Sequence, residues 1–264
     1  MGNKYFKVTP STLPKTDFRY IAWKKSLINR PPPWNKGKTK YNDVGVAKIS
    51  NTFLSKKLDN FKNWRIEARE TNIIPDTKKS LVKNKDLAFL IGLVLGDGNI
   101  CQVSRTECLA IVLGTDKPEL WKYAKKIVER IFHKKLTVKK RKNVNCVDIR
   151  LYQNNLSKRL GVLKGKRKNM KLVIPTWIQK NRSYLIAYIK GLFEAEGYFS
   201  VHKKTYTYNL SFTNLNISLL NQVEMCLRKW KFHPERRKTE VRLRRKTEVY
   251  KFIDLISFRS YPLI

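Results

Sequence analysis

The sequence predicts an α+β protein in which two similar αββαββα halves follow an extended basic arm that carries short helices. Three observations support this prediction. An apolar helix that ends in an acidic residue and a glycine occurs twice, similar strand and helix patterns follow each copy, and the copies keep an offset of 99 residues. A hydrophobic fraction of 42% over 264 residues is sufficient for a buried core.

The arm covers residues 1–85 and differs from the rest of the chain in its proline-rich breaks. The proline run at 31–33 is incompatible with the interior of a helix or a sheet. Apolar residues three to four positions apart favour short helices at 20–27, 44–58 and 58–70. We therefore expect an extended basic segment that is joined to a compact region.

The two halves are predicted over residues 86–160 and 183–264, with residues 161–182 as the connector. Each half is expected to contain an apolar helix, strands, an amphipathic helix and further strands. In the first half these segments are 85–96, 108–113, 117–132, 136–142 and 144–152. In the second half they are 183–195, 206–212, 217–230, 234–238 and 240–245, with Tyr206, Tyr208, Leu210 and Phe212 on one strand face.

Each apolar helix carries two small residues four positions apart, and therefore on one face. They are Gly92 and Gly96 in the first helix and Gly191 and Ala195 in the second. Small residues at this spacing let two helix backbones approach closely. We expect the helices to pack through these faces, which would bring Asp97 and Glu196 together at their C-terminal ends.

Two neighbouring carboxylates repel each other, and each also lies at the negative end of a helix dipole. A hard divalent cation such as Mg²⁺ would relieve that repulsion, and paired metal sites can activate water against a phosphodiester. A single Asp-Gly or Glu-Gly would ordinarily mark a helix end, with glycine as a left-handed cap. The matched repetition favours a functional pair.

The chain is basic along its whole length, with 57 Lys and Arg against 20 Asp and Glu. Residues 1–86 contain 20 basic and 7 acidic residues, and residues 87–264 contain 37 and 13. This distribution indicates a polyanionic partner, DNA or RNA before an anionic membrane. The longest apolar run, at 87–95, is about half of a membrane span, and residues 1–10 lack the apolar core of a secretory signal.

Metal binding through cysteine or histidine is not expected. The four cysteines show no CxxC spacing and the three histidines are scattered, which argues against a zinc site. We expect free thiols in a reducing, intracellular compartment. The Lys- and Asn-rich composition favours an AT-rich genome such as that of an organelle or a phage.

The segments GLVLGDG at 92–98 and KGLFEAEGYF at 190–199 resemble the two motifs of the LAGLIDADG homing endonucleases in their single-chain form. The resemblance covers about residues 85–264. It implies two halves related by a pseudo-twofold axis, whose sheets form a saddle over the DNA major groove. It also implies that Asp97 and Glu196 are catalytic and bind Mg²⁺ or another divalent cation.

The resemblance further implies a monomeric, intron-encoded homing endonuclease that cuts both strands of a long double-stranded DNA site. Two positions depart from the motifs, because Leu95 replaces an inner acid and Lys190 replaces a small residue. Thr115 and Asn214 stand where many family members carry Gln or Lys near the active site, so they are candidates for binding DNA there.

The segment PPPWNKGKT at 31–39 looks like a modular DNA-binding motif found beside homing endonucleases. Trp34, Lys36 and Lys38 suit contacts with the minor groove or the DNA backbone; a charged linker is the alternative. On the predicted strands and their loops, the DNA-binding candidates are Lys203, Lys204, Arg242 and Arg244, with Arg242 and Arg244 on one strand face. Each could equally be ordinary solvated charge.

The leading hypothesis is a site-specific, magnesium-dependent DNA endonuclease that uses Asp97 and Glu196. An RNA-binding intron maturase of the same fold is one alternative, with intron RNA as its partner. A DNA-binding regulator without catalysis is another, although paired acids facing phosphates would not help a protein that only binds DNA. No membrane partner is expected.

Overall fold

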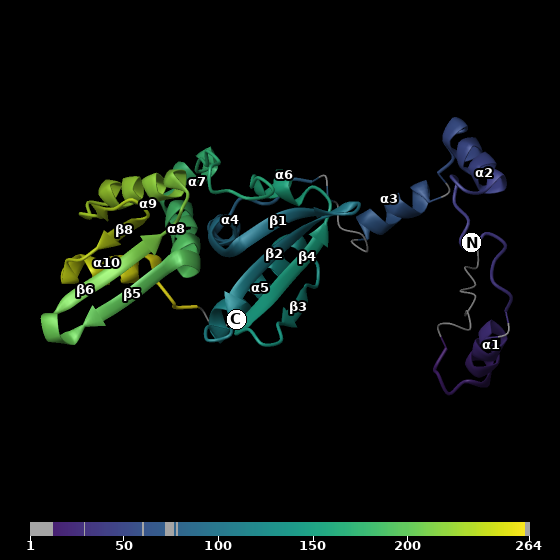
Figure 1. Ribbon diagram of the computed structural model, residues 1–264, viewed down its shortest axis with the longest axis horizontal. Helices are drawn as coiled ribbons and strands as arrows, with labels where there is room; N and C mark the ends of the chain where they lie inside the picture. The colour runs from purple at the N-terminus through teal and green to yellow at the C-terminus, as the bar shows by residue number, and fades with distance from the viewer. Residues whose placement is uncertain (1–12, 29, 60, 72–76, 78, 262–264) are drawn as a thin grey trace, which may run out of the picture. The chain divides into compact units, whose positions relative to one another are not determined.

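A computed structural model describes residues 13–28, 30–59, 61–71, 77 and 79–261 (Figure 1). The chain divides into two compact units, Met1–Glu67 and Ala68–Ile264. The arm boundary predicted at residue 85 falls inside the second unit.

The first unit contains α1 (Phe18–Ile28), α2 (Val44–Ser55) and the start of α3 (Lys62–Glu70). α1 and α2 bury none of their described residues, so local interactions hold them. The Asp43 carboxylate caps α2 by accepting a hydrogen bond from Val46 N at 3.0 Å. The proline run at 31–33 lies outside helix and strand, as predicted. The helix predicted over 58–70 begins at Lys62, and residue 60 lies outside the described residues.

The second unit repeats one order of elements, which confirms the predicted α+β fold with two similar halves. The first half consists of α4 (Lys85–Asp97), β1 (Gly98–Val103), β2 (Thr106–Gly114), α5 (Pro118–Phe132), β3 (Thr137–Lys140), β4 (Cys146–Gln153) and α6 (Leu156–Leu160). After α7 (Thr176–Gln179), the second half consists of α8 (Arg182–Glu196), β5 (Gly197–His202), β6 (Thr207–Thr213), α9 (Ile217–Lys229), β7 (Glu235–Arg236), β8 (Glu240–Leu243) and α10 (Lys246–Ile256). The antiparallel sheets have the equivalent orders β1-β2-β4-β3 and β5-β6-β8-β7.

α4 and α8 lie between the two sheets and form the most extensive contact between elements of the unit (Figure 1). Glycine makes this contact possible. A Cβ atom at Gly92 would lie 2.1 Å from Tyr188 O, and one at Gly191 would lie 2.2 Å from Phe89 O. A Cβ atom at Gly96 would lie 2.4 Å from Ala195 Cβ. The predicted packing through the small residues is therefore observed.

The glycine after each helix has a different role from a left-handed cap. Gly98 (φ −96°, ψ 161°) and Gly197 (φ −84°, ψ 141°) are both extended. A Cβ atom at Gly98 would lie 2.6 Å from Val94 Cα, and one at Gly197 would lie 2.3 Å from Phe193 O. The chain turns from helix directly into strand, and only glycine avoids the preceding helical turn.

The amphipathic helices α5 and α9 pack against the sheets and close the core of each half. α5 buries Leu120, Ala124, Ile127, Val128 and Phe132, and α9 buries Leu219, Leu220, Val223, Cys226 and Leu227. In β2 and β8 the buried apolar residues, such as Leu109 and Ile111 in β2 and Val241 and Leu243 in β8, alternate with less buried neighbours. One face of each sheet therefore stays free of helices.

A C-terminal strap, residues 259–261, links the two halves. Its Arg259 N donates to Glu194 Oε1 at 2.7 Å, and the Tyr261 hydroxyl donates to Glu194 Oε2. The Tyr261 ring packs on Tyr123 of α5 with a centroid separation of 5.3 Å. Glu194 is buried in α8, so this carboxyl anchors a segment that reaches the first half.

Two details of the strand predictions are wrong. Tyr206 does not lie on the β6 face with Leu210, because it has a left-handed backbone (φ 49°) after a short 3₁₀ turn at Lys203–Thr205. Arg244 does not share a strand with Arg242, because β8 ends at Leu243 and α10 follows at once. Among the helices of the described residues, none has the length and apolarity that a membrane span requires.

Candidate functional site

The two predicted site acids are the last residues of the two central helices. Asp97 ends α4 and Glu196 ends α8, and both are half-buried. Because α4 and α8 touch through Gly96 and Ala195, one residue before each acid, the two helix ends lie side by side. A Cβ atom at Gly96 would also lie 3.2 Å from Glu196 Cγ.

The surroundings of these carboxylates disfavour their charge. Burial, and after it the negative charge of Glu196, raise the pKa of Asp97 to about 7, against the opposite effect of the Lys117 ammonium. Burial also raises the pKa of Glu196 above its ordinary value. Among the described residues, no ion-pair or hydrogen-bond partner of the Asp97 carboxylate is found. The pair of carboxylates would therefore be stabilised by a positively charged partner.

Asn214 and Thr115 hold equivalent positions but differ in their contacts. Each follows the second strand of its half, and its backbone N–H donates across the sheet end: Thr115 to Asn145 O and Asn214 to Thr239 O, both at 3.0 Å. Asn214 Nδ2 also donates to Glu196 Oε1 at 3.3 Å. Of the two residues, Asn214 is thus the one seen to bond a site carboxylate.

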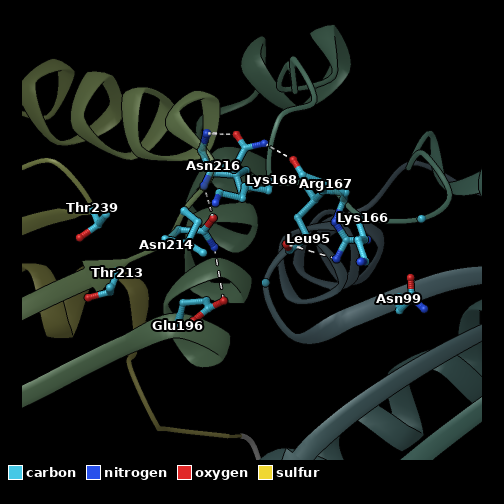
Figure 2. Close-up of a pocket in the computed structure, with 14 residues that line it drawn as sticks. Leu95, Asn99, Lys166, Arg167, Lys168, Glu196, Thr213, Asn214, Asn216 and Thr239 are labelled. Atoms are coloured by element: carbon cyan, nitrogen blue, oxygen red, sulfur yellow. Dashed lines mark hydrogen bonds between the residues drawn. The ribbon is translucent and has the colours of Figure 1, made fainter.

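A cavity of about 570 Å³ opens beside Glu196. Figure 2 shows Asn214 and Asn216 on one side and the connector residues Lys166, Arg167 and Lys168 on the other. Asn99 of β1 and Thr213 of β6 also line it. The cavity therefore brings residues from both halves and the connector to one place.

The sheet faces that lack helices carry matched arginines. Arg150 of β4 pairs in register with Ala110, and Arg242 of β8 pairs with Ser211. Both guanidinium groups are held by acids: Arg150 by Asp148 at 2.9 Å and Arg242 by Glu235 at 2.8 Å. Arg242 is thus an oriented side chain, not a free one.

The remaining predicted DNA-binding residues are exposed or half-exposed. Lys203 and Lys204 lie in the turn between β5 and β6, and Arg244 lies just after β8. In the first unit, Trp34 is 61% exposed and the Lys38 Nζ lies 5.4 Å from its ring centroid. Lys38 also pairs with Asp43 at 3.0 Å. Lys36 is exposed.

Sequence reasoning missed three residues of this region: Lys117, Arg167 and Asn216. The offset of 99 relates Lys117 to Asn216, since each is the N-cap residue of an amphipathic helix. That offset could have marked the pair as candidates. No repeat marks Arg167, because the connector occurs once.

The donor set fits a hard divalent cation. Two half-buried carboxylates with raised pKa values offer oxygen ligands, and a hard cation would supply the charge that the site lacks. The described residues hold no cluster of three or more His, Cys, Asp or Glu suited to a metal. Most coordination positions would therefore belong to water or to phosphate oxygens.

These features define a two-half α+β protein with a carboxylate pair at its central helix ends. Residues 183–261, which lie in the second of the two halves, match the family model described as the LAGLIDADG-like domain. This match confirms the resemblance seen in the second motif. A comparison with curated proteins finds no match.

Several solved structures are similar to this chain. A mesophilic variant of the homing endonuclease I-DmoI is 18% identical, with 67% of this chain and 98% of that chain covered and a TM-score of 0.47. The LAGLIDADG homing endonuclease I-LtrWI bound to target DNA is 12% identical (68% and 85% covered; TM-score 0.45). The N-terminal LAGLIDADG domain of WhiA is 15% identical (69% and 85% covered; TM-score 0.44).

Proposed function

We propose that this protein is a site-specific DNA endonuclease that hydrolyses both strands of a duplex with divalent cations, Mg²⁺ foremost, held by Asp97 and Glu196. The observation that carries the proposal is the convergence of the two carboxylates at glycine-packed helix ends. Such a pair destabilises the protein at neutral pH and so calls for a reason other than folding.

The residues around the pair have separate roles in this proposal. Asn214 orients Glu196 through its amide, and the Lys117 charge acts on Asp97. When bound, divalent cations activate a water and stabilise the leaving oxygen of the phosphodiester. The glycine contact sets the spacing of the two acids, so that one phosphodiester can be reached from both halves.

The helix-free sheet faces would bind the duplex over a long site. Arg150 and Arg242 present oriented guanidinium groups, which suit base edges or phosphates. The exposed Lys203, Lys204 and Arg244 would contact phosphates, as would Trp34, Lys36 and Lys38 of the first unit. The formal charge of +37 supports a polyanionic partner.

The test is cleavage of a plasmid library that carries randomised inserts, in Mg²⁺ and in EDTA. We expect double-strand cutting at one recurrent sequence in Mg²⁺ alone, reduced by at least about a thousandfold in Asp97→Asn and in Glu196→Gln, since each removes a ligand of the metal. Asp254→Asn, an exposed acid on α10, is the matched control and should cut normally.

Two other outcomes would overturn the proposal. Sequence-specific DNA binding without cutting in any divalent cation would indicate a regulator. Tight binding to structured intron RNA without DNA cutting would indicate a maturase.

A further inference from the structure

The connector between the two halves makes hydrogen bonds to both of them beside the carboxylate pair. Gly165 N donates to Ile100 O of β1 at 3.1 Å, and Leu172 O accepts from Gln222 Nε2 of α9 at 2.8 Å. Between these two points lies Arg167, which lines the cavity next to Glu196. The connector therefore contributes residues to the site, in addition to joining the two halves.

Toward the first half, Arg167 binds the C-terminal end of α4. Its Nη2 donates to Val94 O at 2.9 Å, and it also donates to Gly98 O. The last carbonyls of a helix carry its negative dipole end. The guanidinium binds Val94 O, which also accepts from Gly98 N, and Gly98 O, and so it bonds to both sides of the turn that presents Asp97.

Toward the second half, the backbone of Arg167 is held by Asn216. Asn216 Nδ2 donates to Arg167 O and, at 2.9 Å, to Met170 O. Asn216 N donates to Asn214 Oδ1 at 2.8 Å, and Asn214 Nδ2 reaches Glu196 Oε1. Figure 2 shows the bonds from Arg167 to Leu95 O at the end of α4, from Asn216 to Arg167 O and to Asn214, and from Asn214 to the Glu196 carboxylate.

We propose that Arg167 and Asn216 are positioning residues that hold the helix ends bearing Asp97 and Glu196 in register across the two halves. This inference rests on the proposed function, because register matters only if both carboxylates serve one reaction. The bonding of Arg167 supports it. No carboxylate neutralises its guanidinium among the described residues, and its Nη1 is buried without a hydrogen-bond partner. A half-buried cation whose hydrogen bonds go to carbonyl groups alone indicates a positional role.

Asn216→Ser isolates the bond to the connector. Serine is a good N-cap, so the start of α9 is preserved, but the amide donors to Arg167 O and Met170 O are lost. In amide hydrogen exchange without added metal, the backbone amides of residues 95–99 should exchange at least about threefold faster in the variant than in the wild type, although Asn216 does not contact them. Asn221→Ser, on the exposed side of the same helix, should leave those amides unchanged. Unchanged exchange at 95–99 in Asn216→Ser would overturn the inference, whether or not the protein is a nuclease.

The second measurement is Mn²⁺ affinity, followed by loss of the free-ion electron paramagnetic resonance signal. Arg167→Met should weaken the affinity by about tenfold, as loss of an orienting partner does. Arg167→Lys should restore part of the affinity, because it keeps the charge but not the fork. Lys171→Met removes an exposed connector cation and should bind as the wild type does.

A merely structural Arg167 would give a lower melting temperature with unchanged Mn²⁺ affinity, and this result would also overturn the inference. If the wild type itself binds no Mn²⁺, the proposed function fails. The exchange measurement on Asn216→Ser then still decides whether the connector couples the two helix ends.

Discussion

Asp97 and Glu196 are placed where their charge is least stable without a partner. Burial, and after it the charge of Glu196, act against the ionisation of Asp97 and raise its pKa to about 7. Functional sites commonly sacrifice stability in this way.

The stability of the apo protein should therefore depend on Asp97. Because its folded pKa of about 7 exceeds its unfolded value of 3.8, the folded state binds the proton more tightly, and stability falls as pH rises from about 4 to 7. Asp97→Asn should remove this loss and stabilise the apo protein at pH 8 by about 1–3 kcal/mol, allowing for solvent screening. Urea unfolding in EDTA at pH 5 and pH 8 measures the effect.

The Asp97→Asn variant also tests whether metal binding stabilises the fold. Mn²⁺ should stabilise the wild type and not Asp97→Asn, because only a folded site with both carboxylates binds the ion. Asp254→Asn should behave as the wild type does at both pH values. A variant that is less stable than the wild type at pH 8 would contradict this account of the site.

At this scale, the sequence predicted that the helix ends bearing the two acids lie together, but not which residues surround them. Asp97 and Glu196 stand at repeated motif ends, so one pattern marks both. Arg167 acts on carbonyls of residues 94 and 98, about seventy positions earlier in the chain, and no local pattern encodes that contact. Lys203 and Arg242 were inferred from their charge and their place on predicted strands or loops, which cannot show that Glu235 already holds Arg242.

Among the elements, the α4–α8 contact is the one least tolerant of substitution. Gly191→Ala would place a methyl group 2.2 Å from Phe89 O, which is backbone and cannot rotate away. We expect a loss of about 2–4 kcal/mol or a separation of the helices, as overpacking does. Gly45→Ala in α2 would place its Cβ atom 3.1 Å from Asp43 Oδ1 and 4.0 Å from Trp34 Cζ3, both side-chain atoms, and should leave unfolding of the second unit unchanged.

Circular dichroism during urea unfolding, with cleavage assayed on the same samples, measures the Gly191→Ala effect. The distance between the two helix ends should change, so DNA cleavage should decrease by a larger fraction than the free energy of unfolding does. Wild-type stability in Gly191→Ala would show that the helices pack differently.

Most elements could be predicted because hydrophobic periodicity is local. The motif helices and amphipathic helices agree with the structure to within one or two residues. The short strands β7 and β8 were overextended, because alternating charged residues look alike in a strand and in the loop after it. Tyr206 was misplaced because a left-handed turn interrupts an apparently regular aromatic alternation.

For the whole molecule, charge sets the expected binding behaviour. A basic protein that neutralises about ten phosphates should show a log–log slope of affinity against salt near −9. Fluorescence anisotropy of a labelled duplex between 50 and 400 mM KCl, roughly the range where counterion release dominates, tests this expectation. Lys203→Ala with Lys204→Ala should make the slope shallower by about two. A nearly flat titration would contradict duplex binding along the basic surface.

The strap has a consequence for how a duplex could be accommodated. The halves are joined at the glycine contact, along the connector and again where Tyr261 meets Tyr123. Two halves that are joined at three separate places cannot rotate about a single hinge. The protein would therefore act as a stiff template, and the curvature needed for a close fit would have to come from the nucleic acid, so that easily bent base steps would be favoured without being touched.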